Sequence, residues 1–264
     1  MSGLETRQAA GFTTVDRAGV LVVTVDRPPA NALNRPVIRD LAILFAELGE
    51  MREAPPVVLT GQGERFFCAG GDIRELEGAA QEELDARMRE FHALLVAMDR
   101  YPRPVIGAIN GHCVGGGMEI ALFADTVLAV QGARFGFPEI NHGLLPADKG
   151  IQRATRLLGA RAARKLLLSG DLFDVERALE IGLVDVLADP AELVDAAVAS
   201  ARLAGAKAPV LYGALKRSLN DPDDARDETS LQRTLASAAE YFDDPVARGL
   251  RDSWNGSRSR GGKG

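Results

Sequence analysis

Hydrophobic residues along the first half of the chain follow two different periods, and each period predicts a different kind of element. Short runs of apolar and β-branched residues, bounded by turn residues, predict buried strands at 20–25, 57–61, 105–109 and 126–130. Residues 36–51 and 82–100 instead repeat apolar side chains at helical spacing. Strands that alternate with helices in this way are typical of an α/β fold.

The start of the chain departs from this alternation. Two strand-like runs are separated there only by Ala18-Gly19, so residues 12–26 predict a hairpin. Pro28-Pro29 follows and is expected to end the second strand.

Beyond Gly150 the pattern becomes mainly helical. Helices are predicted at 151–158, 160–168, 175–181 and 191–204, with a short strand at 184–187. Residues 210–254 are helical in pattern almost throughout, with breaks expected near Asp221-Pro222 and at 243–245. We therefore expect a core over residues 1–204 and a helical C-terminal region over residues 205–264.

Composition and charge narrow the class of protein. The 264 residues carry a formal net charge of -6 and are 46% hydrophobic, which is ordinary for a globular enzyme and unlike a nucleic-acid-binding protein. The two cysteines, Cys68 and Cys113, form no disulfide or zinc-binding pattern, so we expect no metal site. No apolar run reaches the length of about 18 residues typical of a membrane span, and residues 1–10 lack the apolar stretch of a signal peptide. These features predict a cytoplasmic enzyme with no membrane or nucleic-acid partner.

Two glycine-rich segments each follow a predicted strand: residues 67–73 (FCAGGDI) and residues 110–119 (NGHCVGGGME). Glycine leaves backbone N–H groups unblocked, and a helix N-terminus adds positive potential beside them. Two such segments facing each other would offer one oxygen two N–H donors, which is the geometry of an oxyanion hole. Each segment alone is also explained by a tight connection, and neither matches the phosphate-binding or dinucleotide-binding glycine patterns.

Two carboxylates accompany these segments. Glu119 ends the second glycine segment, and Glu139 follows 139 − 119 = 20 residues later. The predicted strand at 126–130 could return the chain so that both acids enter one pocket, where they could act as acid and base. The alternative is that Glu119 is only a first-turn acid of a helix and Glu139 a solvated loop residue.

Several ordered motifs resemble those of the crotonase (enoyl-CoA hydratase/isomerase) superfamily. Residues 67–73 resemble its F-C-A-G-A-D-[IL] loop, and residues 104–120 (PVIGAINGHCVGGGMEI) resemble its P-V-I-A-A-[VI]-N-G-x-A-x-G-G-G-x-E-[IL] segment. Residues 135–140 match F-G-x-P-E-[IV]. Further matches follow at 152–159 and 169–185, so the resemblance covers about residues 12–254.

The resemblance implies a crotonase-like spiral of ββα repeats with a C-terminal α-helical trimerisation region, and a homotrimer or homohexamer. It implies an acyl-CoA thioester as substrate, without a separate cofactor. The oxyanion hole falls on the N–H groups of Gly71 and Gly116. The coenzyme A side of the site is then lined by Ala69, Gly70, Asp72 and Ile73, with Arg74 and Arg27 as candidates near the nucleotide end. For Arg27 the alternative is a solvated surface charge.

The acids decide the reaction that the resemblance implies. Hydratases of the superfamily use glutamates at the positions of Glu119 and Glu139, whereas many of its isomerases keep an acid only at the second position. Having both glutamates favours hydration of a 2-enoyl-CoA, with Glu119 deprotonating water and Glu139 protonating Cα. The alternatives are an isomerase, another crotonase-type reaction, or an acyl-CoA-binding scaffold without activity.

The chain departs from the family pattern where a glycine-rich G-x-G-G-T-Q-R is usual. It has Ala147-Asp148-Lys149 there, and the Ala147 N–H can replace that of glycine only if its φ suits alanine. Asp148 is either the N-cap of the next helix or, with Lys149, part of the acyl pocket, where Lys149 would pair with a catalytic glutamate. His142 is either a polar group of the pocket or an ordinary loop histidine. These departures suggest a polar or cyclic acyl group.

Overall fold

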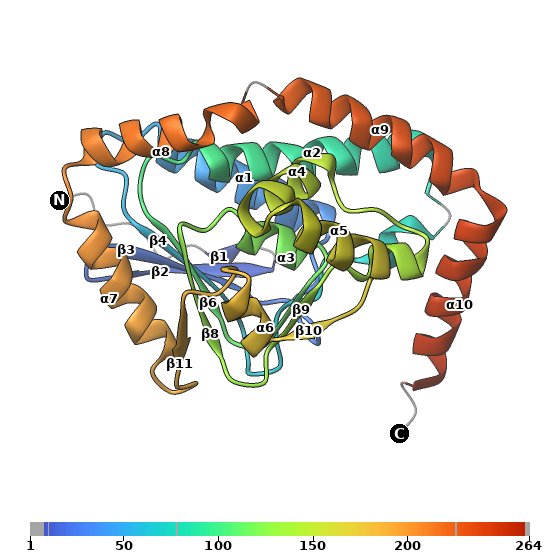
Figure 1. Cartoon of the computed structure of the whole chain (residues 1–264), viewed down its shortest axis with the longest axis horizontal. Helices are drawn as coiled ribbons and strands as arrows, with labels where there is room; N and C mark the ends of the chain where they lie inside the picture. Colours follow the sequence, from blue (N-terminus) through green and yellow to red (C-terminus); the bar gives the residue numbers. More distant parts are fainter. Residues whose placement is uncertain (1–7, 10, 78, 225, 262–264) are drawn as a thin grey trace.

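Two sheets run through the core of the protein, and apart from the first three strands, neighbouring strands come from separate parts of the sequence (Figure 1). The computed structural model describes residues 8–9, 11–77, 79–224 and 226–261. In the large sheet the strand order is β1 (Gln8–Ala9), β2 (Phe12–Arg17), β3 (Val20–Val25), β4 (Val57–Gly61), β6 (Val105–Ile109), β8 (Thr126–Val130) and β11 (Val186–Ala188). In the small sheet it is β10 (Phe173–Asp174), β9 (Arg134–Gly136), β7 (His112–Val114) and β5 (Phe66–Cys68).

A ββα unit repeats along the chain and gives the fold its spiral form. β4 and β5, β6 and β7, and β8 and β9 are successive pairs, and each pair contributes one strand to each sheet. The first pair leads to α2 (Gln81–Arg100) and the second to α3 (Gly116–Ala121). Strands β3, β4, β6 and β8 are parallel neighbours. All five residues of β4 and of β6 are buried, which explains why these strands read as unbroken apolar runs. The expected crotonase-like α/β fold is confirmed.

Some element predictions were incomplete or wrong. The small sheet was not foreseen, because its strands are only two or three residues long, too short to show a period. Helix α3 begins at Gly116, inside the second glycine segment. The break expected near Asp221-Pro222 comes slightly later, because α8 (Pro209–Asp224) runs through both residues and the next helix begins at Asp227.

Helices cover the sheets on both sides. α1 (Arg35–Gly49) is capped by the Asn34 side chain, which accepts a hydrogen bond from the Val37 N–H at 3.2 Å. It packs against α2, with the rings of Phe45 and Tyr101 edge to face at 5.5 Å. The remaining α-helices before residue 206 are α4 (Asp148–Leu158), α5 (Ala160–Ser169), α6 (Val175–Glu180) and α7 (Leu193–Gly205). Two short 3-10 helices also occur, η1 (Ile73–Leu76) and η2 (Pro138–His142). None of the helices in the described ranges is long and apolar enough to span a membrane.

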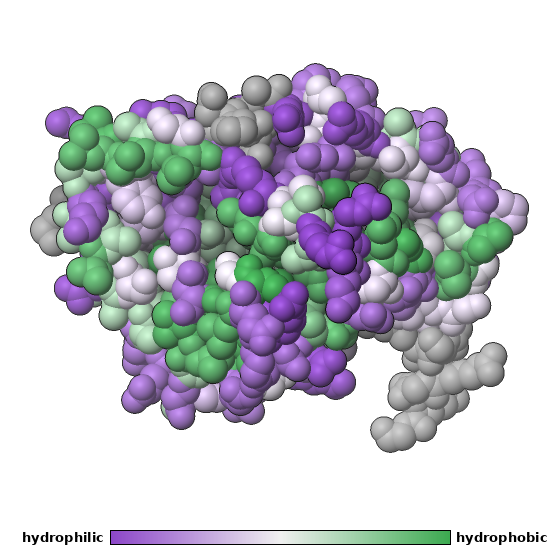
Figure 2. All heavy atoms as spheres, viewed as in Figure 1, coloured by the Kyte–Doolittle hydropathy of each residue, from purple (hydrophilic) through white to green (hydrophobic). Residues whose placement is uncertain are grey.

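The C-terminal region consists of α8, α9 (Asp227–Asp243) and α10 (Pro245–Gly261), which extend along α2 and then past the edge of the core (Figure 1). Helix α8 places polar side chains inward: Lys216 and Asn220 are buried. Its outward side is apolar, with Leu211, Leu215 and Leu219 between 64% and 71% exposed. Figure 2 shows the resulting hydrophobic patch over α8. This arrangement is the reverse of a helix that faces water.

A buried ionic network joins the C-terminal helices to the core. Asp99 of α2, fully buried, lies 2.9 Å from Lys149 Nζ and 3.3 Å from Arg153 Nη1, both on α4. Lys149 also contacts Asp227 at the start of α9 at 2.5 Å. The Asn220 side chain of α8 donates to the Asp99 carbonyl oxygen at 2.9 Å. Four helices are thus held by one cluster of charges.

We predict that Asp99→Asn lowers the free energy of unfolding by about 3 kcal/mol, because it leaves a buried cation uncompensated. Urea denaturation measures this loss. Glu180→Gln, which breaks the exposed pair of Arg177 and Glu180 at 2.8 Å, serves as the control and should cost at most about 1 kcal/mol. Equal effects of the two substitutions would contradict a structural role for the network.

Candidate functional site

The two glycine segments lie against each other because the strands before them are neighbours. β5 and β7 pair in parallel, with Cys68 opposite Cys113. A Cβ added to Gly116 would lie 3.7 Å from the Gly71 nitrogen, and one added to Gly70 would lie 3.1 Å from the Gly116 nitrogen. Gly70 also has a φ of +85°, which favours glycine. The predicted facing of the two segments is therefore present.

Both candidate N–H donors are available to a ligand. The Leu33 N–H donates to the Gly70 oxygen, and the Leu33 oxygen accepts the Asp72 N–H, each at 2.8 Å. These two bonds flank Gly71 and leave the Gly71 N–H unused. Gly116 is the first residue of α3, whose N–H has no acceptor within the helix. Within residues 11–77 and 79–224, neither N–H meets a hydrogen-bond acceptor. An oxygen placed between them would find two donors and the positive end of a short helix.

A largely apolar cavity of about 780 Å³, counting its open mouth, adjoins these N–H groups. Leu84, Met88 and Phe91 of α2 form one wall. Tyr241 of α9 and Trp254 of α10 also line it. The C-terminal helices thus complete the pocket of the same chain.

Glu119 reaches this cavity from α3 and is only 2% exposed. Its Oε2 accepts a hydrogen bond from the Ala147 N–H at 3.1 Å. A Cβ added to Gly150 would collide with the same oxygen, so only glycine fits at that position. Glu119 is therefore a buried pocket residue, and its interpretation as an ordinary first-turn acid is wrong.

Glu139 enters the same cavity from η2, after β9 has returned the chain beside β7. Its Oε2 is buried and has no hydrogen-bond partner among the described residues. Its Oε1 lies so close to Gly115 that an added Cβ there would come within 2.9 Å, and Gly115 has a φ of +56°. The alternative of a solvated loop carboxylate does not hold.

The environment of the two acids makes them share protons. Burial raises the pKa of Glu119 well above its ordinary value, and the neighbouring Glu139 charge raises it further, while the Ala147 N–H acts in the opposite direction. Burial raises the pKa of Glu139 to about 7. Because two adjacent buried carboxylates resist ionising together, the pair holds a proton near neutral pH.

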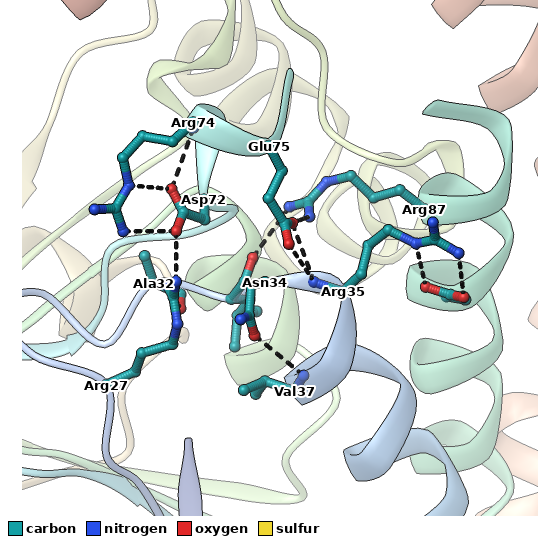
Figure 3. A network of polar contacts seen from close by, with 11 residues as sticks. Arg27, Ala32, Asn34, Arg35, Val37, Asp72, Arg74, Glu75 and Arg87 are labelled. Carbon is teal, nitrogen blue, oxygen red and sulfur yellow. Dashed lines mark hydrogen bonds and ion pairs between the residues drawn. The ribbon is translucent and has the colours of Figure 1, made fainter. Parts of the chain in front are cut away.

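The residues predicted on the coenzyme A side divide into two groups. Ala69, Gly70, Asp72 and Ile73 line the cavity. Arg27 and Arg74 are not among the lining residues; both contact the Asp72 carboxylate at 2.7 Å (Figure 3). Burial alone would raise the pKa of Asp72, but the hydrogen bonds from Arg74 and Arg27 hold it below its usual range.

The two arginines differ in how free they are. Arg27 also donates to the Ala32 oxygen at 2.9 Å, and its side chain is 24% exposed, so it is not a free surface charge. The Arg74 side chain is 66% exposed. Arg74 is therefore the more accessible cation at this edge of the site.

The backbone and side-chain contacts of residues 147–149 show how the chain accommodates its departure from the glycine-rich family pattern. Ala147 has a φ of −63°, which suits alanine, and its N–H serves Glu119. Asp148 is the first residue of α4 and not its N-cap, which is Ala147. The Lys149 side chain contacts Asp99 and Asp227, so the alternative in which it pairs with a catalytic glutamate does not hold. His142 lines the cavity and stacks on Trp254 with ring centroids 4.0 Å apart.

Arg87, Tyr241 and Trp254 are among the pocket side chains that were not predicted from the sequence. Arg87 had a detectable signal, because it lies three residues after Leu84 and four before Phe91, on the apolar side of its helix. Tyr241 and Trp254 had none, since they reach the site only through the course of α9 and α10. Across the described residues, no group of three or more His, Cys, Asp or Glu side chains could hold a metal ion.

Comparison with known proteins agrees with this geometry. Residues 16–251 match the family model described as enoyl-CoA hydratase/isomerase. The chain is 36% identical over 204 residues to "Probable enoyl-CoA hydratase EchA17" of Mycobacterium tuberculosis, covering 77% of this chain and 78% of that protein. It is also 36% identical over 206 residues to "Short-chain-enoyl-CoA hydratase" of Clostridium acetobutylicum, covering 76% and 77% respectively.

A solved structure of an enoyl-CoA hydratase/isomerase from Mycobacterium paratuberculosis superposes with a TM-score of 0.84 at 27% identity, covering 92% of this chain and 98% of that one. The family match spans nearly the whole described core, both glycine segments and both glutamates. The chain therefore belongs to the enoyl-CoA hydratase/isomerase family.

Proposed function

We propose that the protein hydrates the 2,3 double bond of an enoyl-CoA thioester. The observation that carries this proposal is the meeting of two buried carboxylates and two unused N–H groups in one cavity. A site that only bound acyl-CoA would gain nothing from burying Glu119 and Glu139, because desolvating carboxylates is costly.

The N–H groups of Gly71 and Gly116 are proposed to bind the thioester oxygen. Water addition at Cβ places negative charge on that oxygen as an enolate, and fixed donors stabilise it more than the neutral carbonyl. Each donor contributes on the order of 10²- to 10³-fold in rate in comparable oxyanion holes. The reaction needs no separate cofactor, because the thioester itself makes Cα acidic.

The two glutamates are proposed to move the protons. In the form of the pair that carries one proton, the reacting state has the charge on Glu119, where the Ala147 N–H stabilises it, and Glu119 deprotonates the attacking water. In that state Glu139, whose buried Oε2 has no hydrogen-bond partner among the described residues, holds the proton and delivers it to Cα. Both protons move within one protonation state of the pair, so addition and elimination use the same form of the enzyme.

An isomerase is the second candidate. A carboxyl group with a pKa of about 7 can carry a proton from one carbon to another without Glu119. Product analysis after reaction in deuterated water separates the two. Hydration yields a 3-hydroxyacyl thioester with deuterium at Cα, whereas isomerisation moves the double bond and adds no hydroxyl group.

Glu119→Gln should lower kcat for crotonyl-CoA hydration by at least about 10²-fold, because the amide cannot accept the proton of water. Affinity for a saturated acyl-CoA should change little, as measured by calorimetry. Glu64→Gln, an exposed glutamate, is the matched control. Unchanged hydration by the Glu119 variant would remove this residue from the mechanism.

Hydration should also be fastest where the pair holds one proton, and it should fall at higher pH as that last proton is lost. Burial raises the pKa of both glutamates, so this window lies near and above neutral pH. At lower pH, protonation of the remaining carboxylate should reduce the rate, giving a bell-shaped profile of kcat/KM. Dehydration of the product should follow the same profile. A flat profile between about pH 5 and 9 in both directions would disagree with a shared proton.

We further propose that the chain assembles as a trimer or hexamer through the outer side of α8. The support is its exposed leucines, whose burial against a second copy would be favourable.

Leu211→Lys combined with Leu215→Lys should shift the molar mass in light scattering from three or six chains toward one. Gln62→Lys, in an exposed loop, adds a similar charge and should leave the mass unchanged. A monomeric parent protein at micromolar concentration would refute the assembly.

A further inference from the structure

Arg87 is a buried cation beside the reacting centre that the mechanism above does not use. It lies on α2, is 7% exposed and lines the cavity. A Cβ added to Gly71 would collide with its Nη2 and lie 3.5 Å from its Cζ. The guanidinium therefore rests directly on the glycine whose N–H is proposed to bind the thioester oxygen.

Two hydrogen bonds hold Arg87 in this place. Its Nη1 donates to Glu75 Oε2 at 2.5 Å, and its Nη2 donates to the Leu33 carbonyl oxygen at 3.2 Å. Glu75 is held in turn by the Arg35 backbone N–H, at 3.0 and 3.1 Å from its two oxygens (Figure 3). The side chain thus has one fixed position between η1, α2 and the segment before α1.

The Leu33 carbonyl connects Arg87 to the oxyanion loop. The same oxygen accepts the Asp72 N–H, while the Leu33 N–H donates to the Gly70 oxygen. Gly71 is therefore clamped between two hydrogen bonds that share Leu33, and Arg87 anchors the acceptor of one of them. Movement of Leu33 would shift the Gly71 N–H relative to that of Gly116.

We propose that Arg87 is a positioning residue for enolate stabilisation, which fixes the Gly71 N–H and adds positive charge behind it. This inference rests on the proposed binding of the thioester oxygen by Gly71 and Gly116. The charge of Arg87 is balanced by Glu75, whose side chain is 28% exposed and bonds Nη1, whereas Gly71 meets Nη2. Water screens Glu75 more than the buried guanidinium, so a net positive field remains at Gly71.

The direct test measures enolate formation without requiring hydration. Acetoacetyl-CoA forms an enolate that absorbs in the near ultraviolet, so the absorbance of the saturated complex against pH gives the apparent pKa of the bound thioester. In Arg87→Met that pKa should rise by about one unit, which is a tenfold loss of enolate. Arg87→Lys should fall between, because it keeps the charge but not the planar fork.

Hydration kinetics provide the second measurement. Arg87→Met should lower kcat for crotonyl-CoA by about tenfold with little change in KM, as expected for an interaction that acts in the transition state. In Arg87→Met the unpaired Glu75 could itself lower the rate. The double variant Glu75→Gln/Arg87→Met removes both charges, and it should show the same loss as Arg87→Met. Arg89→Met, on the exposed side of the same helix, removes an equal charge and is the control that should match the parent.

Each outcome decides a different statement. If the parent protein forms no enolate from bound acetoacetyl-CoA, the proposed function fails. If the parent protein forms it and both Arg87 variants do so equally, the role of Arg87 is overturned while the proposed function stands. A lower melting temperature of Arg87→Met with an unchanged enolate pKa would also overturn it, because that result describes a purely structural arginine.

Discussion

The close approach of two backbone segments, one after β5 and one after β7, is the constraint on which the site depends. Their strands pair in parallel, so both segments leave the small sheet in the same direction. No side chain fits where they touch: a Cβ on Gly117 would lie 2.5 Å from the Cys68 carbonyl oxygen, and one on Gly70 would meet Val114 and Gly116 at 3.1 Å. This packing is what brings the Gly71 and Gly116 N–H groups to one point. Every further group of the site is arranged around that point.

Burial of charge is the second feature of the site, and the fold compensates for it in two ways. Glu119 has the Ala147 N–H, and burial raises the pKa of Glu139, which favours its neutral form. Behind them, Asp99 and Lys149 neutralise each other and fix the start of α4. Because Ala147 and Gly150 belong to that first turn, the ionic network that joins the helices also holds the surroundings of Glu119. Stability and catalysis therefore depend on the same few contacts.

The C-terminal helices serve the same pocket in a different manner. Tyr241 and Trp254 close it from α9 and α10, and His142 stacks on Trp254 at its edge. Helix α8 instead presents leucines outward, where a second copy of the chain is proposed to cover them. Assembly through α8 would restrain α9 and α10 as well, since α8 shares the Asp99 network with α9. In this way the proposed oligomer and the pocket are physically linked.

The sequence by itself determined the class of fold, the longer strands and helices, and the two glycine segments with their glutamates. These features are local, because apolar periodicity, glycine content and motif spacing can be recognised in one segment without knowing which other segments it contacts. Only the tertiary structure decided that Lys149 turns to Asp99 instead of a glutamate, that Arg87 rests on Gly71, and that Tyr241 and Trp254 line the cavity. Lys149 and Asp99 are 149 − 99 = 50 positions apart, and Arg87 and Gly71 are 87 − 71 = 16 apart. A charged or aromatic side chain has no period that reveals which distant surface it will meet. The small sheet escaped prediction for the related reason that strands of two or three residues gain their stability from neighbours and not from their own sequence.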